Sequence, residues 1–167
     1  MLLSASSMKY LIFFSLMLLS LLPSRAGEND WYIGSSGHVL FNPSSRAARY
    51  GASLSLEKQL EGRKYIEFSL LATGYPHRNL IKESELILQG YYKPILSLGK
   101  NNYGVLKLGP NLGFGSIGLL FGVGVGFEYD VILKSGIKLY ISQDNLLVFR
   151  GDDRFSCGLS AGIRLPL

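Results

Sequence analysis

Strict alternation between Ile117 and Tyr129 constrains the fold more than any other stretch of this chain. One set of alternate positions is apolar or aromatic, and the other is mostly glycine and ends at Glu128. A period of two places the two sets on opposite faces of an extended chain. The four glycines would cost a helix several kcal/mol, at about 1 kcal/mol each. The stretch therefore predicts a β-strand with one continuously apolar face.

Two other interpretations of this stretch fail on its spacing. The glycines from Gly122 to Gly126 resemble a dinucleotide-binding run, but that motif lies between a strand and a helix, and these glycines lie inside the strand. A transmembrane helix needs about 20 apolar residues, and this run ends after eleven, at Glu128. The strand alone fits either a soluble sandwich, with its apolar face inside, or a barrel in lipid.

The N-terminus indicates export. A basic residue precedes an apolar run from Tyr10 to Leu22, and a cleavage site of small residues follows, ending at Ala26. This order is typical of a signal peptide, and the run is short for a membrane anchor. We therefore expect residues 1–26 to be a signal peptide, with Met8 the better initiator. Residues 27–167 would then form a single exported domain.

The composition favours a lipid-facing surface. Charged residues make up 17% of the chain and aromatic residues 12%, against about 25% charged residues in ordinary soluble domains. The single cysteine, Cys157, excludes an intrachain disulfide, so the core or its surroundings must stabilise the fold. Loss of Lys9 and Arg25 with the signal peptide lowers the net charge from +5 to +3, which is too mild to predict nucleic-acid binding.

The same alternation divides the mature chain into eight extended segments, which short turn signals separate. These segments are 32–41, about 50–57, 64–73, 84–96, 103–114, 117–133, 137–149 and 155–165. No helical period follows residue 26. The sequence therefore predicts an all-β fold, an eight-stranded antiparallel up-and-down β-barrel of outer-membrane type. With both termini in the periplasm, the longest loop, Gly74 to Lys82, would face outside.

The two faces of the segments indicate whether the outside of the barrel meets lipid or water. Charged and small residues share one face, which we expect to line the lumen, whereas a soluble lipocalin-type barrel would carry its charges outside. Charges of both signs can pair there, as burial requires. The predicted lumen charge network consists of Glu57, Glu67, Glu85, Lys107, Glu128, Lys138 and Arg164. The residues predicted to face lipid are Ile117, Leu119, Phe121, Val123, Val125 and Phe127.

Aromatic residues cluster towards the segment ends, as the girdles of membrane barrels do. They are Tyr50, Tyr65, Tyr75, Tyr92, Tyr103, Phe114, Tyr129, Phe149 and Phe155. The glycine face of the segment around Gly124 is expected to make room for larger neighbours such as Lys138 and Tyr140, or to ease the curvature of the barrel.

The sequence offers little support for catalysis. No cluster of histidine, cysteine and aspartate has metal-ligand spacing, and His38 and His77 are the two histidines. A lipid-modifying enzyme could use His77 with a nearby serine, but a solvated imidazole is ordinary in such a polar loop. Arg150-Gly151-Asp152 spells an adhesion tripeptide, and glycine with aspartate is also ordinary turn chemistry. We predict no catalytic residue, no cofactor and no metal.

From Leu80 to the C-terminus the order of features resembles the TraO family of conjugative-transposon proteins from Bacteroidetes. The stretches that carry the resemblance are Leu80-Ile81-Lys82-Glu83-Ser84-Glu85, Gln89-Gly90-Tyr91-Tyr92, Leu108-Gly109-Pro110-Asn111-Leu112-Gly113-Phe114, Phe121-Gly122-Val123-Gly124-Val125-Gly126 and Ser160-Ala161-Gly162-Ile163-Arg164-Leu165. The chain departs from the family at its end, where Pro166-Leu167 stands in place of the terminal aromatic residue that the insertion machinery reads.

The resemblance implies a non-enzymatic outer-membrane component of the conjugation (mating-pair) apparatus. Its partners would be outer-membrane lipid and other envelope proteins of the apparatus, without direct contact to nucleic acid. Two alternatives stay open: a general surface barrel that presents loops to host or phage, and a lipid-modifying enzyme that uses His77.

Overall fold

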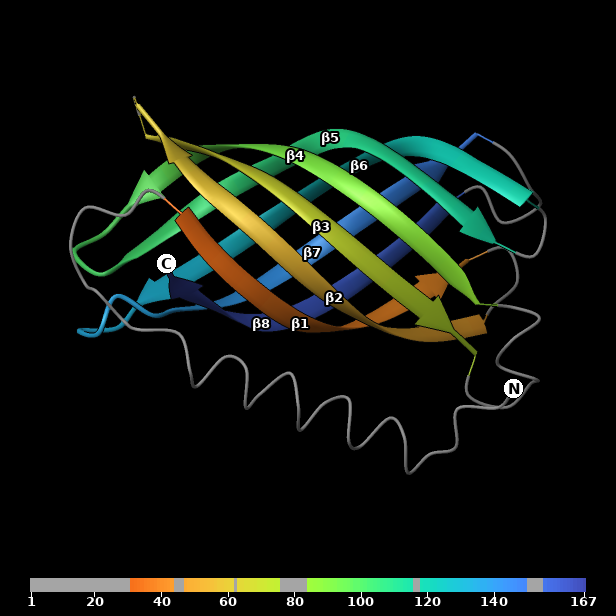
Figure 1. Ribbon diagram of the computed structural model, residues 1–167, viewed down its shortest axis with the longest axis horizontal. Helices are drawn as coiled ribbons and strands as arrows, with labels where there is room; N and C mark the ends of the chain where they lie inside the picture. Colours follow the sequence, from red (N-terminus) through yellow and green to blue (C-terminus); the bar gives the residue numbers. More distant parts are fainter. Residues whose placement is uncertain (1–30, 44–46, 62, 76–83, 116–117, 150–154) are drawn as a thin grey trace.

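Eight strands form a closed barrel in sequence order in the computed structural model (Figure 1). The structure describes residues 31–43, 47–61, 63–75, 84–115, 118–149 and 155–167. The strands are β1 (Trp31–Asn42), β2 (Ala47–Leu60), β3 (Lys64–Gly74), β4 (Glu85–Leu98), β5 (Asn102–Gly115), β6 (Gly118–Ile132), β7 (Lys138–Val148) and β8 (Phe155–Pro166). Each strand pairs antiparallel with the next, and β1 pairs with β8 to close the ring. The predicted eight-stranded up-and-down barrel is confirmed.

Several predictions concern residues outside this described part of the chain. They are the signal peptide of residues 1–26, Met8, Ile117, His77 with most of its loop, and Arg150-Gly151-Asp152. Among the described residues, no helix is both long and apolar enough to cross a membrane.

Burial alternates along β6 with the period that its sequence predicts. Its apolar set points outward, and the five described members of the predicted lipid-facing set are between 36% and 48% exposed. These five are Leu119, Phe121, Val123, Val125 and Phe127. The glycine set faces the lumen and ends at Glu128, which is fully buried.

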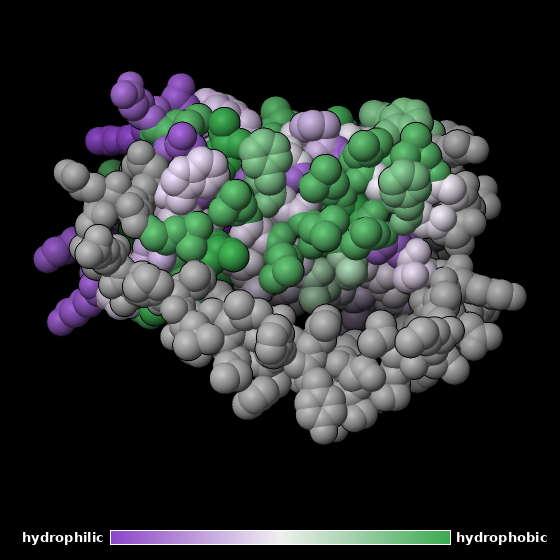
Figure 2. Space-filling view, viewed as in Figure 1, coloured by the Kyte–Doolittle hydropathy of each residue, from purple (hydrophilic) through white to green (hydrophobic). Residues whose placement is uncertain are grey.

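The outer surface of the barrel has an apolar middle and one polar end. Figure 2 shows apolar side chains across the middle of one face and polar side chains projecting at the end on the left. That end carries the connections β2–β3, β4–β5 and β6–β7 (Figure 1), and we call it the turn end. The opposite end, where β1, β3, β5 and β7 end, is the loop end.

The predicted aromatic girdles form in part. Six members lie exposed on the outer surface: Tyr50, Tyr92, Phe114, Tyr129, Phe149 and Phe155. For Tyr65 and Tyr103 the prediction is wrong, because they are only 5% and 3% exposed and their rings stack inside the barrel at 5.6 Å between centroids. Both have the odd numbering that faces the lumen in β3 and β5, so strand parity overrides their position near a strand end.

Candidate functional site in the barrel lumen

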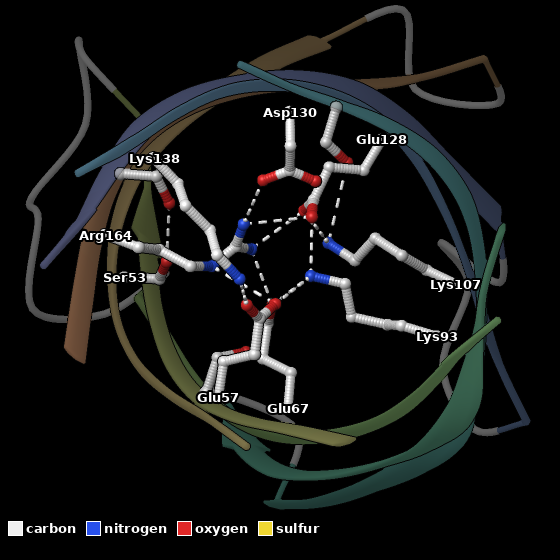
Figure 3. A network of polar contacts seen from close by, with 12 residues as sticks. Ser53, Glu57, Glu67, Lys93, Lys107, Glu128, Asp130, Lys138 and Arg164 are labelled. Carbon is white, nitrogen blue, oxygen red and sulfur yellow. Dashed lines mark hydrogen bonds and ion pairs between the residues drawn. The ribbon is translucent and has the colours of Figure 1, made fainter. Parts of the chain in front are cut away.

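Arg164 on β8 lies at the centre of an ionic network that fills the turn-end half of the lumen (Figure 3). Its Nη2 is 2.6 Å from Glu67 Oε2 and 2.8 Å from Glu128 Oε2. Its Nη1 is 2.9 Å from Asp130 Oδ1, and its Nε is 3.5 Å from Glu57 Oε2. One fully buried guanidinium therefore joins carboxylates from β2, β3 and β6. Such charge-assisted contacts are the strong class of hydrogen bond.

Lys93 on β4 is the second centre of the network. Its ammonium donates to Glu57, Glu67 and Glu128, with a distance of 2.9 Å between Lys93 Nζ and Glu67 Oε2. These three carboxylates place ligand oxygens within 4.8 Å of one another, which is a spacing that a metal ion could use. The ammonium of Lys93 contacts all three carboxylates, so a side chain of the protein supplies the positive charge that balances them.

Two further lysines extend the network towards its edges. Lys138 donates to Glu57 Oε1 at 2.7 Å, and its ammonium lies 4.1 Å from the centre of the Tyr65 ring. Lys107 lies 2.9 Å from Asp144 Oδ1 and also packs over a lumen tyrosine. Tyr65 thus covers the edge of the network, which explains why it lies inside the barrel. Within the described strands the network holds five acids and four bases: Glu57, Glu67, Glu128, Asp130 and Asp144 with Lys93, Lys107, Lys138 and Arg164.

Like charges stand beside each other along the wall, and opposite charges meet across the lumen. Glu57 of β2 is the direct register partner of Glu67 of β3, and Lys138 of β7 is the direct partner of Arg164 of β8. Like charges directly opposite in a ladder destabilise the pair of strands. Contacts across the lumen compensate both pairs, so the network ties the β2–β3 wall to the β7–β8 wall.

Six of the seven residues of the predicted lumen network meet in it, and Glu85 does not. Glu85 pairs with Arg49 at the loop end, where Arg49 also donates to Ser156 Oγ at 2.7 Å. Glu85 begins β4 and stands eight residues before Lys93, which is roughly 25 Å along a strand. Alternation gives the face of a side chain, but Glu85 shows that it does not give its level along the axis.

Sequence reasoning missed three network residues: Lys93, Asp130 and Asp144. The alternation of each strand indicates that these residues face the lumen. Lys93 continues the inward series of Glu85 and Gln89 in β4, and Asp130 follows Glu128 by two residues in β6. Asp144 likewise continues the inward series of β7, where burial alternates from Lys138 onward. Extending each alternating series to the end of its strand would have found all three.

Two glycines provide the space that the lumen side chains need. A Cβ on Gly34 would lie 2.8 Å from Cγ of Arg164, so glycine lets the arginine lie flat against β1. A Cβ on Gly124 would lie 2.5 Å from the hydroxyl oxygen of Tyr91 and 2.7 and 3.0 Å from two of its ring carbons. The glycine face of β6 thus makes room for a larger neighbour at Gly124, as expected, but this neighbour is Tyr91 of β4 and not Lys138 or Tyr140.

A histidine and two serines form a smaller cluster next to the network. His38 Nε2 lies 2.8 Å from Ser36 Oγ and 3.0 Å from Ser53 Oγ, and the two hydroxyl oxygens are 2.7 Å apart. The three residues are all buried in the barrel wall, on β1 and β2. They have the composition of a catalytic base with a nucleophile. Their polar atoms, however, hydrogen-bond to one another inside a packed lumen, so we assign them a structural role.

An apolar layer closes the lumen between the ionic network and the loop end. It consists of Leu40, Leu71, Ile87 and Leu146, from four different strands. A cavity lined by Ile87 and Leu146 holds only about 10 Å³, which is room for about one water molecule. The described lumen is therefore filled by side chains, as expected for eight strands. Chemically, this arrangement rigidifies the barrel rather than binding a ligand.

An apolar exterior around an ionic, side-chain-filled interior is the arrangement of transmembrane β-barrels. The chain has the fold of the small outer-membrane barrels. Neisserial surface protein A is similar to it in structure, with a TM-score of 0.68 and 14% identity, and the match covers 84% of this chain and 99% of that chain.

Two further solved structures match the barrel. The N-terminal β-barrel domain of OprF from Pseudomonas aeruginosa has a TM-score of 0.53 and 15% identity, over 83% of this chain and 99% of that chain. Ail, the attachment invasion locus protein of Yersinia pestis, has a TM-score of 0.50 and 12% identity, over 82% and 96%. No family model and no curated protein matches the chain. At such identities the likeness concerns the fold alone.

Proposed function

We propose that this protein is a non-enzymatic barrel of the outer membrane that acts through contacts with other envelope proteins. The filled lumen carries the proposal. A barrel whose interior is occupied by fully buried Arg164 and Lys93, with an apolar layer above them, leaves its outer wall, turns and loops as the surfaces for function.

Three observations support a place in the outer membrane. Large exposed apolar side chains lie on all eight strands. Soluble monomeric proteins rarely expose an apolar surface of this extent to water. The similar solved structures include outer-membrane and surface proteins, such as Ail and Neisserial surface protein A. The N-terminal sequence is typical of an exported protein.

We place this activity in a conjugative transfer apparatus, because the second half of the chain resembles the TraO family. Deletion of the gene in a donor strain should lower the transfer frequency, and the gene supplied in trans should restore it. Unchanged transfer after deletion would remove the conjugative role and leave the membrane barrel untouched.

A second candidate is a surface barrel whose loops bind a host or a phage. The solved structure of Ail, an attachment invasion locus protein, favours it, since the two chains share the fold. The same deletion strain separates the candidates: loss of cell binding or phage sensitivity with normal transfer would support the second.

Membrane fractionation tests the outer-membrane location directly. A folded barrel should sediment with the outer membrane and migrate faster on a gel before boiling than after. In vesicles it should leave small-solute permeability at the level of lipid alone, because the lumen is filled. Recovery as a soluble periplasmic protein would refute the location, and steady solute flux would refute the filled lumen.

A further inference from the structure

Two amide side chains stand on the apolar outer wall at the middle of β7. Gln143 is exposed and Asn145 half-buried, and they share the outward parity of the strand. Gln143 Nε2 donates to Asn145 Oδ1 at 2.8 Å, and Asn145 Nδ2 lies 3.3 Å from Gln143 Oε1. The register partners of Gln143 on the two neighbouring strands are apolar, Phe127 and Leu159. The amides therefore interrupt the apolar belt near its mid-height.

This position leaves hydrogen-bonding groups without water. A side-chain amide offers two N–H donors and an oxygen with two lone pairs. The contact between Gln143 and Asn145 uses one donor and one lone pair of each, so one donor and one lone pair of each remain. In a membrane the hydrocarbon cannot satisfy them, and unsatisfied polar groups there are unfavourable.

A groove runs beside the amides on the same wall. It has a volume of about 490 Å³ and lies over β1, β8, β7 and β6. Its lining includes Gln143 together with two small residues, Gly37 and Ala161, which are register partners. A Cβ added to Gly37 would meet nothing within 4 Å, so the wall is recessed there. Small residues beside a polar one are the features that let membrane-embedded segments approach closely and bond.

We propose that this wall, with Gln143 and Asn145 at its centre and Gly37 and Ala161 as its recess, binds a second copy of the same chain. The patch offers donors and acceptors in equal number, so it is complementary to itself. Both copies enter the membrane in the same direction, which requires a two-fold axis along the membrane normal. Such an axis brings the two Gln143 side chains to the same depth. A lipid acyl chain could fill the recess but has no group to pair with the amides.

The proposal rests on the proposed insertion in the outer membrane, and gel mobility before and after boiling reports that insertion separately for every variant. Cys157, the native cysteine, is the register partner of Asn145 and lies on the same wall. We would replace it by alanine so that one introduced thiol reports proximity. Leu159→Cys places this thiol in the patch and leaves both amides in place, because Leu159 is exposed and is the register partner of Gln143. Leu70→Cys is the matched control, because Leu70 is exposed near the middle of β3, on a strand remote from β7 in the ring.

Oxidation of membranes that hold each variant tests the contact. We expect a disulfide-linked dimer from Leu159→Cys and monomer from Leu70→Cys. Equal cross-linking at both positions, no dimer from a heat-modifiable Leu159→Cys protein, or a cross-link to a different envelope protein would each overturn the proposal. If the unmodified protein is not heat-modifiable, the outer-membrane assignment falls, and this interface falls with it.

A second measurement removes the amides instead of reporting on them. Gln143→Leu combined with Asn145→Leu should keep the barrel folded, since leucine suits a lipid-facing site. Energy transfer between labels at Ser135→Cys, in the β6–β7 turn, gives the dimerisation constant in vesicles. We expect the double change to weaken dimerisation on the order of tenfold, and Leu70→Ala to leave it unchanged. An unchanged constant after loss of both amides would refute their role.

Discussion

Replacement of Arg164 by methionine should destabilise the barrel more than any change in an exposed turn. The guanidinium is fully buried and contacts four carboxylates, three of them at 2.6 to 2.9 Å. Its loss leaves five acids facing three bases in the network. Removal of one partner from a buried ion pair costs about 3–5 kcal/mol, because the partner charge stays buried without compensation. We expect a loss of that size in the free energy of unfolding.

Urea unfolding in lipid vesicles measures this loss. The single tryptophan, Trp31, begins β1 and reports whether the strand is in place. With a slope of about 1–3 kcal/mol per molar urea, the midpoint should fall by about 1 M or more. Lys134→Met, which removes a positive charge from an exposed turn, is the matched control and should change stability by less than about 0.5 kcal/mol.

A double-mutant cycle separates loss of charge balance from loss of packing. Glu128→Gln removes one of the acids that Arg164 contacts, so in the Arg164→Met background it should restore part of the stability. Coupling between contacting residues is about 0.5–3 kcal/mol. A loss in the free energy of unfolding below about 1 kcal/mol for Arg164→Met, or no coupling with Glu128→Gln, would refute the view that the network stabilises the barrel.

Other changes test the packing and the outer wall. Gly124→Ala should lower the free energy of unfolding by about 1–3 kcal/mol through contact with the Tyr91 ring, and adding Tyr91→Ala should relieve the overlap, as urea titration would show. Val125→Arg, at the middle of β6, should cost about 2–4 kcal/mol in vesicles, whereas Ser135→Arg in a turn should cost less than about 0.5 kcal/mol. His77→Ala should leave the lipid profile of the outer membrane unchanged by mass spectrometry, and an altered profile would revive the enzyme interpretation.

The sequence was sufficient for the fold because one signal, alternation with period two, repeats along eight segments. It also assigned the face of Glu57, Glu128 and Arg164, because parity continues through a strand. It could not assign their level along the axis. Levels depend on strand tilt and on the stagger between neighbours, which no single segment encodes. This is why Glu85 was grouped with a network that lies near the opposite end of the lumen.

The same limit explains the errors with aromatic residues. Tyr65 and Tyr103 lie near strand ends, where girdle residues are common, and the prediction relied on that position. Their parity points inward, and inside the barrel Tyr65 packs against the ammonium of Lys138. A tyrosine beside a buried cation keeps an apolar body and a favourable ring face. Position along a strand is therefore weaker evidence than parity.

The arrangement of charges supplies what alternation leaves undetermined, the register of the strands. A slip of one residue between β7 and β8 would move the inward side chains of one strand to the outer face and its apolar side chains to the lumen. The alternation of the sequence therefore opposes it. A slip of two residues keeps every face correct, so apolar pattern alone does not oppose it. Such a slip would move Lys138 and Arg164 about 7 Å apart along the wall and take one of them from its carboxylates across the lumen. Carboxylates across the lumen compensate both adjacent like charges in one register only, and we infer that the ionic network selects that register when the barrel closes.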